Sequence, residues 1–336
     1  MSSAMAQEAA EIPSVAARLL LDARPIARAA AALVERAPRF AVICGRGSSG
    51  HVGTYLRYLI ETRLRIVASF AAPSVVTSYD RQPNMANGLF VVISQSGQSP
   101  DLVAALRAAA ADGAITIGIV NDVESPVAKA ADIVIPVSAG EEKSVAATKS
   151  VVNSMLACAC LIGQAAGDRD LLAATMRMPD RLAAALSLDW SAWGETLGRS
   201  RATFVTARGF GLGPAREIAL KVAETIGAPA LAYSAAELRH GPRASVTSDT
   251  PVLALRQADA TAPTIDRLRA DLAANGARVL LAGGPASELP WIGDDHPTCD
   301  PICMLVPAYR SIEREARSMG LDPDRPPFLN KVTRTF

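Results

Sequence analysis

Short apolar runs rich in Val and Ile alternate with longer Ala- and Leu-rich segments along most of the chain. The short runs are typical of strands buried on both faces of a parallel sheet, and the segments between them have the apolar spacing of helices. The pattern therefore predicts strands near 39–44, 65–70, 88–94, 115–120 and 132–137, and again near 203–207, 229–233, 251–256, 278–282 and 302–306.

A Gly-rich turn follows the first strand of each set, which indicates an internal repeat. The run from Val42 to Gly47 is echoed by the run from Val205 to Gly209. Both halves therefore predict an α/β fold in which two doubly wound parallel-sheet domains follow one another. A helix is expected near 14–36. The expected boundaries are an N-terminal helical segment at 1–30, a first domain at 31–165, a helical connector at 166–197, a second domain at 198–325 and a tail at 326–336.

The composition is that of a globular protein without a strongly charged partner. The 336 residues are 50% hydrophobic and 20% charged, with a formal net charge of +1. This balance gives no attraction to nucleic acid or to a membrane surface. No apolar run reaches the roughly 20 residues that span a bilayer, and the N-terminus lacks the basic and apolar regions of a secretion signal. We therefore expect a cytoplasmic protein.

The five cysteines do not form a recognisable metal site. Cys158 and Cys160 would point to different faces of one helix, and Cys299 and Cys303, close to His296, lack a fourth ligand at the usual spacing. Most of these cysteines lie in apolar segments, where a thiol behaves as a small hydrophobic group. We expect no metal.

The segment Val91 to Ser99 runs from a buried-type strand directly into hydroxyl and amide side chains. A helix that starts after a strand leaves backbone N–H groups unpaired, and its dipole favours an anion at that end. Ser and Gln side chains add further donors, and they are Ser94, Gln95, Ser96 and Ser99. The segment predicts a phosphate site, although a Ser-rich loop that only caps a helix is the alternative for this turn taken alone.

The turn from Gly45 to Gly50 matches the G-x-G-x-x-G pattern of dinucleotide-binding proteins. That site also needs an acidic residue about 20 positions further on, at the end of the next strand. The strand near 65–70 ends without a carboxylate, so a nicotinamide cofactor is disfavoured. Gly47, Ser48 and Ser49 are instead expected to face the same anion as the serines after the third strand, because the carboxyl ends of neighbouring parallel strands meet.

The second half carries acids, a lysine and a histidine in place of hydroxyls. Glu217, Lys221 and Glu224 share one helix face, which on its own is also the pattern of an exposed ion pair. Glu237 and His240 lie on a short helix that Gly241 and Pro242 are expected to end.

These features together resemble the tandem sugar isomerase (SIS) domain family. The resemblance rests on the hydroxyl-rich turns, the segments Glu217–Glu224 and Glu237–Pro242, and the tail Leu329-Asn330-Lys331-Val332-Thr333. It covers nearly the whole chain beyond about residue 30. The sequence looks most similar to the isomerase half of glucosamine-6-phosphate synthase and to SIS-type glucosamine-6-phosphate deaminases, which implies two flavodoxin-like SIS domains and no cofactor.

The resemblance implies a role for each matching residue. Glu224 would move a proton between sugar C1 and C2, and Lys221 would support the proton transfers at the oxygens. His240 would assist ring opening from the neighbouring subunit of a homodimer. Lys331 would lie over the open-chain sugar, within a tail that closes the site. The implied substrate- and phosphate-binding set is Gly47, Ser48, Ser49, Ser94, Gln95, Ser96, Ser99, Glu217, Glu237 and the backbone near Val145.

Three features depart from the synthase pattern. The chain begins Met1-Ser2-Ser3 and carries no amidotransferase segment, so glutamine-dependent synthesis is not expected. Ala147 stands where the synthase has Ser, and Arg239 stands where Lys is usual. These two changes leave the substrate preference open.

The resemblance leads to one expected function and several alternatives. The expected reaction converts glucosamine 6-phosphate to fructose 6-phosphate and ammonia. Aldose-ketose isomerisation or deglycation would use the same residues, and a non-catalytic sensor of amino-sugar phosphates is the alternative from another class. A sensor needs only the phosphate site, so the acid, imidazole and amine groups favour an enzyme.

Overall fold

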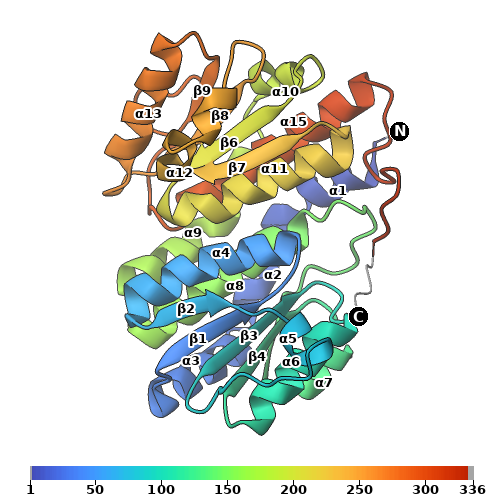
Figure 1. Cartoon of the computed structure of the whole chain (residues 1–336), viewed down its shortest axis with the longest axis vertical. Helices are drawn as coiled ribbons and strands as arrows, with labels where there is room; N and C mark the ends of the chain where they lie inside the picture. Colours follow the sequence, from blue (N-terminus) through green and yellow to red (C-terminus); the bar gives the residue numbers. More distant parts are fainter. Residues whose placement is uncertain (1, 332–336) are drawn as a thin grey trace. The chain divides into compact units, whose positions relative to one another are not determined.

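The computed structural model describes residues 2–331 (Figure 1). Contacts between residues divide this part of the chain into two compact units. The first-sheet unit comprises Ser14–Glu142 and Ser150–Met176. The second-sheet unit comprises residues 2–13, Lys143–Lys149 and Arg177–Lys331. Segments that are far apart in sequence therefore share a unit, and each unit is described by itself. The linear domain boundaries given above stay a prediction.

The first-sheet unit is built on five parallel strands in the order β2-β1-β3-β4-β5. This is the flavodoxin-like order, and it reverses direction between β1 and β3. Every residue of β3 and β4 is buried, as expected for central strands covered on both faces. The strands are β1 (Phe40–Cys44), β2 (Val67–Phe70), β3 (Leu89–Ser94), β4 (Ile115–Val120) and β5 (Ile133–Pro136).

Helices connect these strands and lie on the sheet. Helix α6 begins with Pro100 just after Ser99, a position where the missing N–H of proline costs nothing, and its Leu102 and Leu106 join Phe90 and Val92 in one buried cluster. The helices of the first half are α2 (Ile12–Leu21), α3 (Arg24–Arg36), α4 (Ser48–Leu59) with a π-turn at Ile60–Leu64, α5 (Ser74–Thr77), α6 (Pro100–Ala111), α7 (Pro126–Ala130) and α8 (Lys149–Ala166).

The second-sheet unit has four parallel strands in the order β7-β6-β8-β9, which repeats the start of the first pattern. Its strands are β6 (Thr203–Ala207), β7 (Ala230–Ser234), β8 (Val252–Leu255) and β9 (Val279–Ala282). The helices of this half and of the N-terminus are α1 (Ala4–Ala10), α9 (Arg169–Ala185), α10 (Ser191–Leu197), α11 (Leu212–Ile226), α12 (Ala235–Arg239), α13 (Ala262–Ala274), α14 (Asp300–Cys303) and α15 (Leu305–Ser318). The parallel α/β class and the tandem repeat are confirmed.

The fifth strand predicted near 302–306 is wrong, because this segment is helical in α14 and α15. A short buried apolar run looks the same in a strand and in a buried helix. The residues that follow decide the outcome: Val306, Tyr309 and Ile312 are all fully buried at helical spacing. The single helix expected near 14–36 is likewise two helices, since α2 ends at Leu21 and α3 begins at Arg24 with Pro25 in its first turn.

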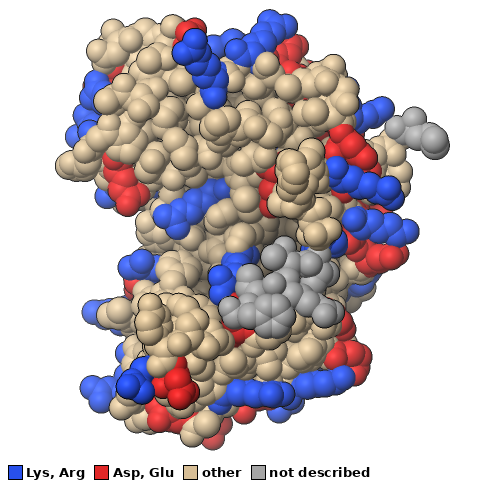
Figure 2. Space-filling model, turned by 45° about the vertical axis from the view of Figure 1, so that its right-hand side comes forward, with Lys and Arg blue, Asp and Glu red and all other residues tan. Residues whose placement is uncertain are grey.

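Among the described residues one helix, α8, has the length and apolarity of a membrane span, and 83% of that window is buried inside the protein. Such burial is typical of a core helix. On the face seen in Figure 2, basic and acidic side chains are interspersed, as the formal net charge of +1 leads one to expect.

Candidate functional site

In the first-sheet unit, the two hydroxyl-rich turns lie at the point where the strand order reverses. Strands β1 and β3 are hydrogen-bonded neighbours, so the turns that follow them are adjacent. A Cβ atom on Gly45 would lie 3.1 Å from the carbonyl oxygen of Ile93, which shows how closely the first turn approaches β3. Ligands of doubly wound sheets bind in the crevice at this reversal.

An ion pair that the sequence did not reveal joins the two turns. Arg46 in the first turn pairs with Asp101 in the first turn of α6, and the Asp101 side chain is almost completely buried. Arg46 remains about half exposed. This pair holds the start of α6 against the end of β1, so the two turns that carry the candidate residues lie next to each other.

The serines after β3 also shape their own turn. The Ser94 Oγ accepts a hydrogen bond from the Gly97 N–H at 3.0 Å, and the Ser96 Oγ accepts one from the Gln98 N–H at 3.4 Å. Gly97 has a φ of +61°, in the left-handed region that favours glycine. Because both hydroxyl oxygens act as acceptors here, their O–H groups can still donate to an anion.

The other candidates of this unit lie at two helix N-termini. Gly47 is at the N-cap of α4, Ser48 and Ser49 are its first two residues, and Ser99 is at the N-cap of α6. Gln95 lies half-buried in the β3 turn. Two helix starts and several hydroxyls are therefore gathered at one edge of the sheet, which is the kind of place where proteins bind phosphate groups.

In the second-sheet unit, Lys221 lies between two carboxylates of the same helix, α11. Its Nζ is 3.3 Å from Glu217 Oε1 and 2.5 Å from Glu224 Oε2. Lys221 and Glu217 are fully buried, whereas the Glu224 side chain is 21% exposed. The spacing alone also allowed an exposed ion pair on this helix face, and that alternative is wrong because Lys221 and Glu217 are buried. Burial alone would lower the pKa of Lys221, but the two carboxylates outweigh it and raise that pKa.

This arrangement leaves one carboxylate accessible beside a buried ammonium group. Tyr309 of α15 lies on the far side of the cluster, with its hydroxyl 3.5 Å from Glu217 Oε1. Glu217 is therefore enclosed by protein, while Glu224 reaches the surface of the unit. A carboxylate held in place by an ammonium group can accept and return a proton.

The short helix α12 ends as predicted, with His240 at its C-cap and Gly241 next. Glu237 forms a capping box with Ser234, in which each side chain accepts from the other residue's N–H at 3.3 Å. Glu237 therefore stabilises the start of α12, a role that differs from the substrate contact implied by the family resemblance. His240 is exposed and lines an open pocket of about 540 Å³ with Arg239 and Arg243, of which Arg239 pairs with Asp271.

Lys331 and the backbone near Val145 lie close together in the second-sheet unit. The Lys331 Nζ donates to the Ser144 carbonyl oxygen at 2.7 Å, and the Val145 N–H donates to the Asp324 carbonyl oxygen at 3.2 Å. Two candidates from distant parts of the sequence are thus brought together. The tail residues Val332–Phe336 lie outside the described residues.

The Gly-rich turn after β6 is filled by the protein itself. The buried Gln257 donates from Nε2 to the Arg208 carbonyl oxygen at 2.6 Å, and a Cβ on Gly211 would lie 3.0 Å from Gln257 Oε1. Sequence reasoning missed Gln257, since it follows a different strand. The two turns of the repeat have therefore diverged: hydroxyl donors gather at the first, and an amide side chain closes the second.

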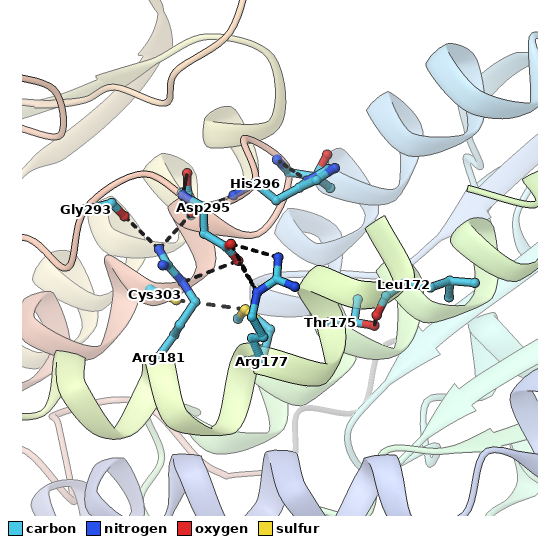
Figure 3. A network of polar contacts seen from close by, with 11 residues as sticks. Leu172, Thr175, Arg177, Arg181, Gly293, Asp295, His296 and Cys303 are labelled. Carbon is cyan, nitrogen blue, oxygen red and sulfur yellow. Dashed lines mark hydrogen bonds and ion pairs between the residues drawn. The ribbon is translucent and has the colours of Figure 1, made fainter. Parts of the chain in front are cut away.

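The cysteine and histidine residues near the C-terminal part serve packing and hydrogen bonding. Within residues 2–331, no three His, Cys, Asp or Glu side chains are grouped so as to hold a metal ion. Figure 3 shows Arg177 and Arg181 of α9 pointing toward Asp295, with Cys303 beside them. The Cys303 Sγ lies 3.9 Å from the Met178 Sδ, and burial raises the pKa of this thiol to about 12.

Comparisons with known proteins identify the family and the fold of this chain. The SIS domain family model matches residues 37–163 and 197–289, one segment on each sheet. A glutamine–fructose-6-phosphate aminotransferase of Symbiobacterium thermophilum is 32% identical over 317 residues, which cover 88% of this chain and 52% of that protein. The chain spans about half the length of the curated relatives it matches.

Two solved structures are also similar. A proposed phosphosugar isomerase from Silicibacter pomeroyi is 38% identical, with a TM-score of 0.92 over 96% of this chain and 100% of that chain. The glucosamine-6-phosphate deaminase of Thermotoga maritima has the same fold, with a TM-score of 0.80 at 23% identity over 99% of this chain and 100% of that chain. On the evidence of its two sheets and both matched segments, this chain belongs to the SIS domain family of phosphosugar isomerases.

Proposed function

We propose that this protein converts glucosamine 6-phosphate and water into fructose 6-phosphate and ammonia. The observation that carries the proposal is the Glu224 carboxylate, partly exposed and held by the buried Lys221 ammonium group. Binding of a phosphosugar alone would need the hydroxyl-rich turns but no such acid and base pair. The fold shared with a deaminase and the relatives named as aminotransferases support an amino sugar as the substrate.

The proposed reaction assigns one step to each group. The turns after β1 and β3 bind the phosphate, and His240 of the neighbouring subunit opens the sugar ring. Glu224 removes the proton from C2, which gives an enolamine, and returns it to C1. The C2 amine is then an imine, and water hydrolyses it to the ketone and ammonia. Lys221 holds Glu224 in position through their ion pair, and Lys331 lies over the open-chain sugar.

The first test is the incubation of the purified full-length chain with glucosamine 6-phosphate, with ammonia and fructose 6-phosphate followed together. We expect both products in equal amounts. The Glu224→Gln variant should lose about 10²- to 10⁴-fold in kcat, the usual contribution of general acid-base catalysis, while phosphosugar binding remains close to that of the unaltered protein.

The Glu35→Gln variant is the matched control, since Glu35 is an exposed acid on α3 and loses the same charge. It should turn over at the unaltered rate. Fructose 6-phosphate and glucose 6-phosphate interconverting without ammonia would replace the proposal by simple isomerisation. Tight phosphosugar binding without any turnover would favour the sensor, and full activity of Glu224→Gln would remove Glu224 from the mechanism.

A further inference from the structure

Helix α1 and the C-terminal segment of the described chain both contact the loop of residues 143–149, and all three belong to the second-sheet unit. Asp324 caps α1, because its carboxylate oxygens accept from the N–H groups of Ala4 at 2.7 Å and Met5 at 2.8 Å. Ser3 at the N-cap of α1 adds a bond from its Oγ to Glu313 Oε1 at 2.6 Å. The start of α1 is thus anchored by acids from the other end of the chain.

Helix α1 in turn holds the 143–149 loop through the Glu8 carboxylate. Glu8 is only 5% exposed, and it accepts from the backbone N–H of Lys143 and, at 3.3 Å, from that of Ser144. The end of the loop is held by a second acid, since the buried Lys149 pairs with Glu11 at 2.6 Å.

The same loop also binds the side-chain amine of Lys331, the residue that the family resemblance places over the sugar. The Ser144 residue whose N–H is bound by Glu8 offers its carbonyl oxygen to Lys331 Nζ at 2.7 Å. The next residue, Val145, donates to the carbonyl oxygen of Asp324, the residue that caps α1. Asp324 is therefore bound both to the start of α1 and to the 143–149 loop. Glu8 of α1 binds the same loop, and the loop in turn binds Lys331.

We propose that Glu8 is a positioning residue, which sets the 143–149 loop in the form that fixes the Lys331 amine and the Val145 backbone for the reaction. The link to catalysis rests on the proposed function, but the effect on Lys331 does not. Glu8, Asp324 and Lys331 all lie outside the two segments matched by the family model, so the SIS segments alone do not contain this device.

The physical reason is the cost of leaving buried backbone groups unpaired. Without the Glu8 side chain, the N–H groups of Lys143 and Ser144 lose their buried acceptor, and the loop gains by moving toward water. The carbonyl of Ser144 moves with it, and Lys331 Nζ loses this partner. Gln7, the preceding residue, is exposed and bonds only locally, to the Ser2 carbonyl oxygen, which makes it a matched control on the same helix.

The test is the acetylation rate of Lys331 in the full chain, with an N-hydroxysuccinimide ester in short pulses and peptide mass spectrometry. Rates are divided by that of the exposed Lys129. We expect Lys331 in Glu8→Ala to react about tenfold faster, as the loss of a hydrogen bond to a charged group implies. Gln7→Ala should match the unaltered chain, and Glu8→Gln, which keeps one acceptor oxygen, should lie between the two.

Turnover of glucosamine 6-phosphate by the same variants completes the test. We expect kcat/KM to fall in the order Gln7→Ala, Glu8→Gln, Glu8→Ala. An unchanged acetylation rate in a folded Glu8→Ala overturns the proposal, as does faster acetylation with unchanged turnover. If Glu8→Ala does not fold, Glu8→Gln decides by the same two readouts. If the unaltered chain has no deaminase activity, only the proposed function fails, and acetylation still decides whether Glu8 positions Lys331.

Discussion

At the scale of single residues, burial and ion pairing compete at Lys221 and at Asp300, and the outcome for the pKa differs between the two. Lys221 has two carboxylates within 3.3 Å, and its charged form is favoured despite complete burial. Asp300 pairs with Arg181 at 2.9 Å and accepts hydrogen bonds from the backbone N–H groups of Asp295 and His296. For Asp300 burial outweighs these contacts and raises the pKa from 3.8 to about 6. The first group stays charged, while the second takes up a proton in mildly acidic solution.

Asp300 should therefore make the free energy of unfolding depend on pH. Between pH 3.8 and about 6 the folded protein binds this proton and the unfolded chain does not, so the contribution of Asp300 to stability falls as pH rises through this window. A shift of this size corresponds to about 3 kcal/mol. We expect the stability of the unaltered protein relative to Asp300→Asn to decline by that order between pH 4 and pH 7, measured by urea unfolding. A difference that does not vary with pH would contradict the assignment.

At the scale of elements, the turn from Ser94 to Ser99 depends on one glycine. Gly97 combines a left-handed φ with close packing, since a Cβ there would lie 2.1 Å from the Ser125 Oγ. That hydroxyl caps α7 by accepting from the Ala128 N–H at 3.3 Å. The β3 turn and the start of α7 therefore cannot move independently, and a side chain at position 97 would disturb both.

Gly97→Ala should consequently destabilise the protein and weaken phosphosugar binding together. The left-handed backbone alone costs about 1 to 3 kcal/mol, and the overlap with Ser125 adds to it. Gly113→Ala is the control, because Gly113 also has a positive φ but no atom within 4 Å of the added Cβ. We expect Gly113→Ala to lower the melting temperature modestly with unchanged affinity in calorimetric titration. Equal effects of the two substitutions would show that packing at Ser125 is unimportant.

At the scale of the whole molecule, the compact units do not follow the order of the sequence. The second-sheet unit consists mainly of Arg177–Lys331, but it also contains residues 2–13 and the short segment Lys143–Lys149, which lie far from that stretch in the sequence. The proposed active site would also combine residues of two chains, because His240 is expected to act in the neighbouring subunit of a homodimer. An exposed His240 beside an open pocket is compatible with that role.

Sharing of a site between subunits predicts complementation of inactive variants. Glu224→Gln and His240→Ala should each lack deaminase activity as homodimers. A mixed dimer would contain one site with both native residues, so co-expression should restore about a quarter of the unaltered activity if subunits assort randomly. Light scattering should show a dimer throughout. Mixed dimers without activity would place His240 and Glu224 in the same subunit's site, or remove His240 from the reaction.

Local patterns account for much of the fold and for part of the candidate site. The apolar runs of β3 and β4 are continuous because both faces of these strands are buried, so they could be recognised without the structure. A strand was predicted at 302–306 because a short buried apolar run looks the same in a strand and in a buried helix, and the helical spacing of buried residues becomes visible only further along α15. The pairing of Arg46 with Asp101 and the placement of Gln257 were missed because each joins separate strand ends.

The sequence by itself determined the parallel α/β class, the internal repeat, the hydroxyl-rich turns and the acid-lysine face of α11. Each of these features is visible in short runs of consecutive or helically spaced residues. Only the tertiary structure decided that Lys221 is buried between its acids, that Lys331 meets Ser144, and that Glu8 holds the same loop. Burial and long-range hydrogen bonds depend on which segments pack together, and that choice is made by the free energy of the whole fold.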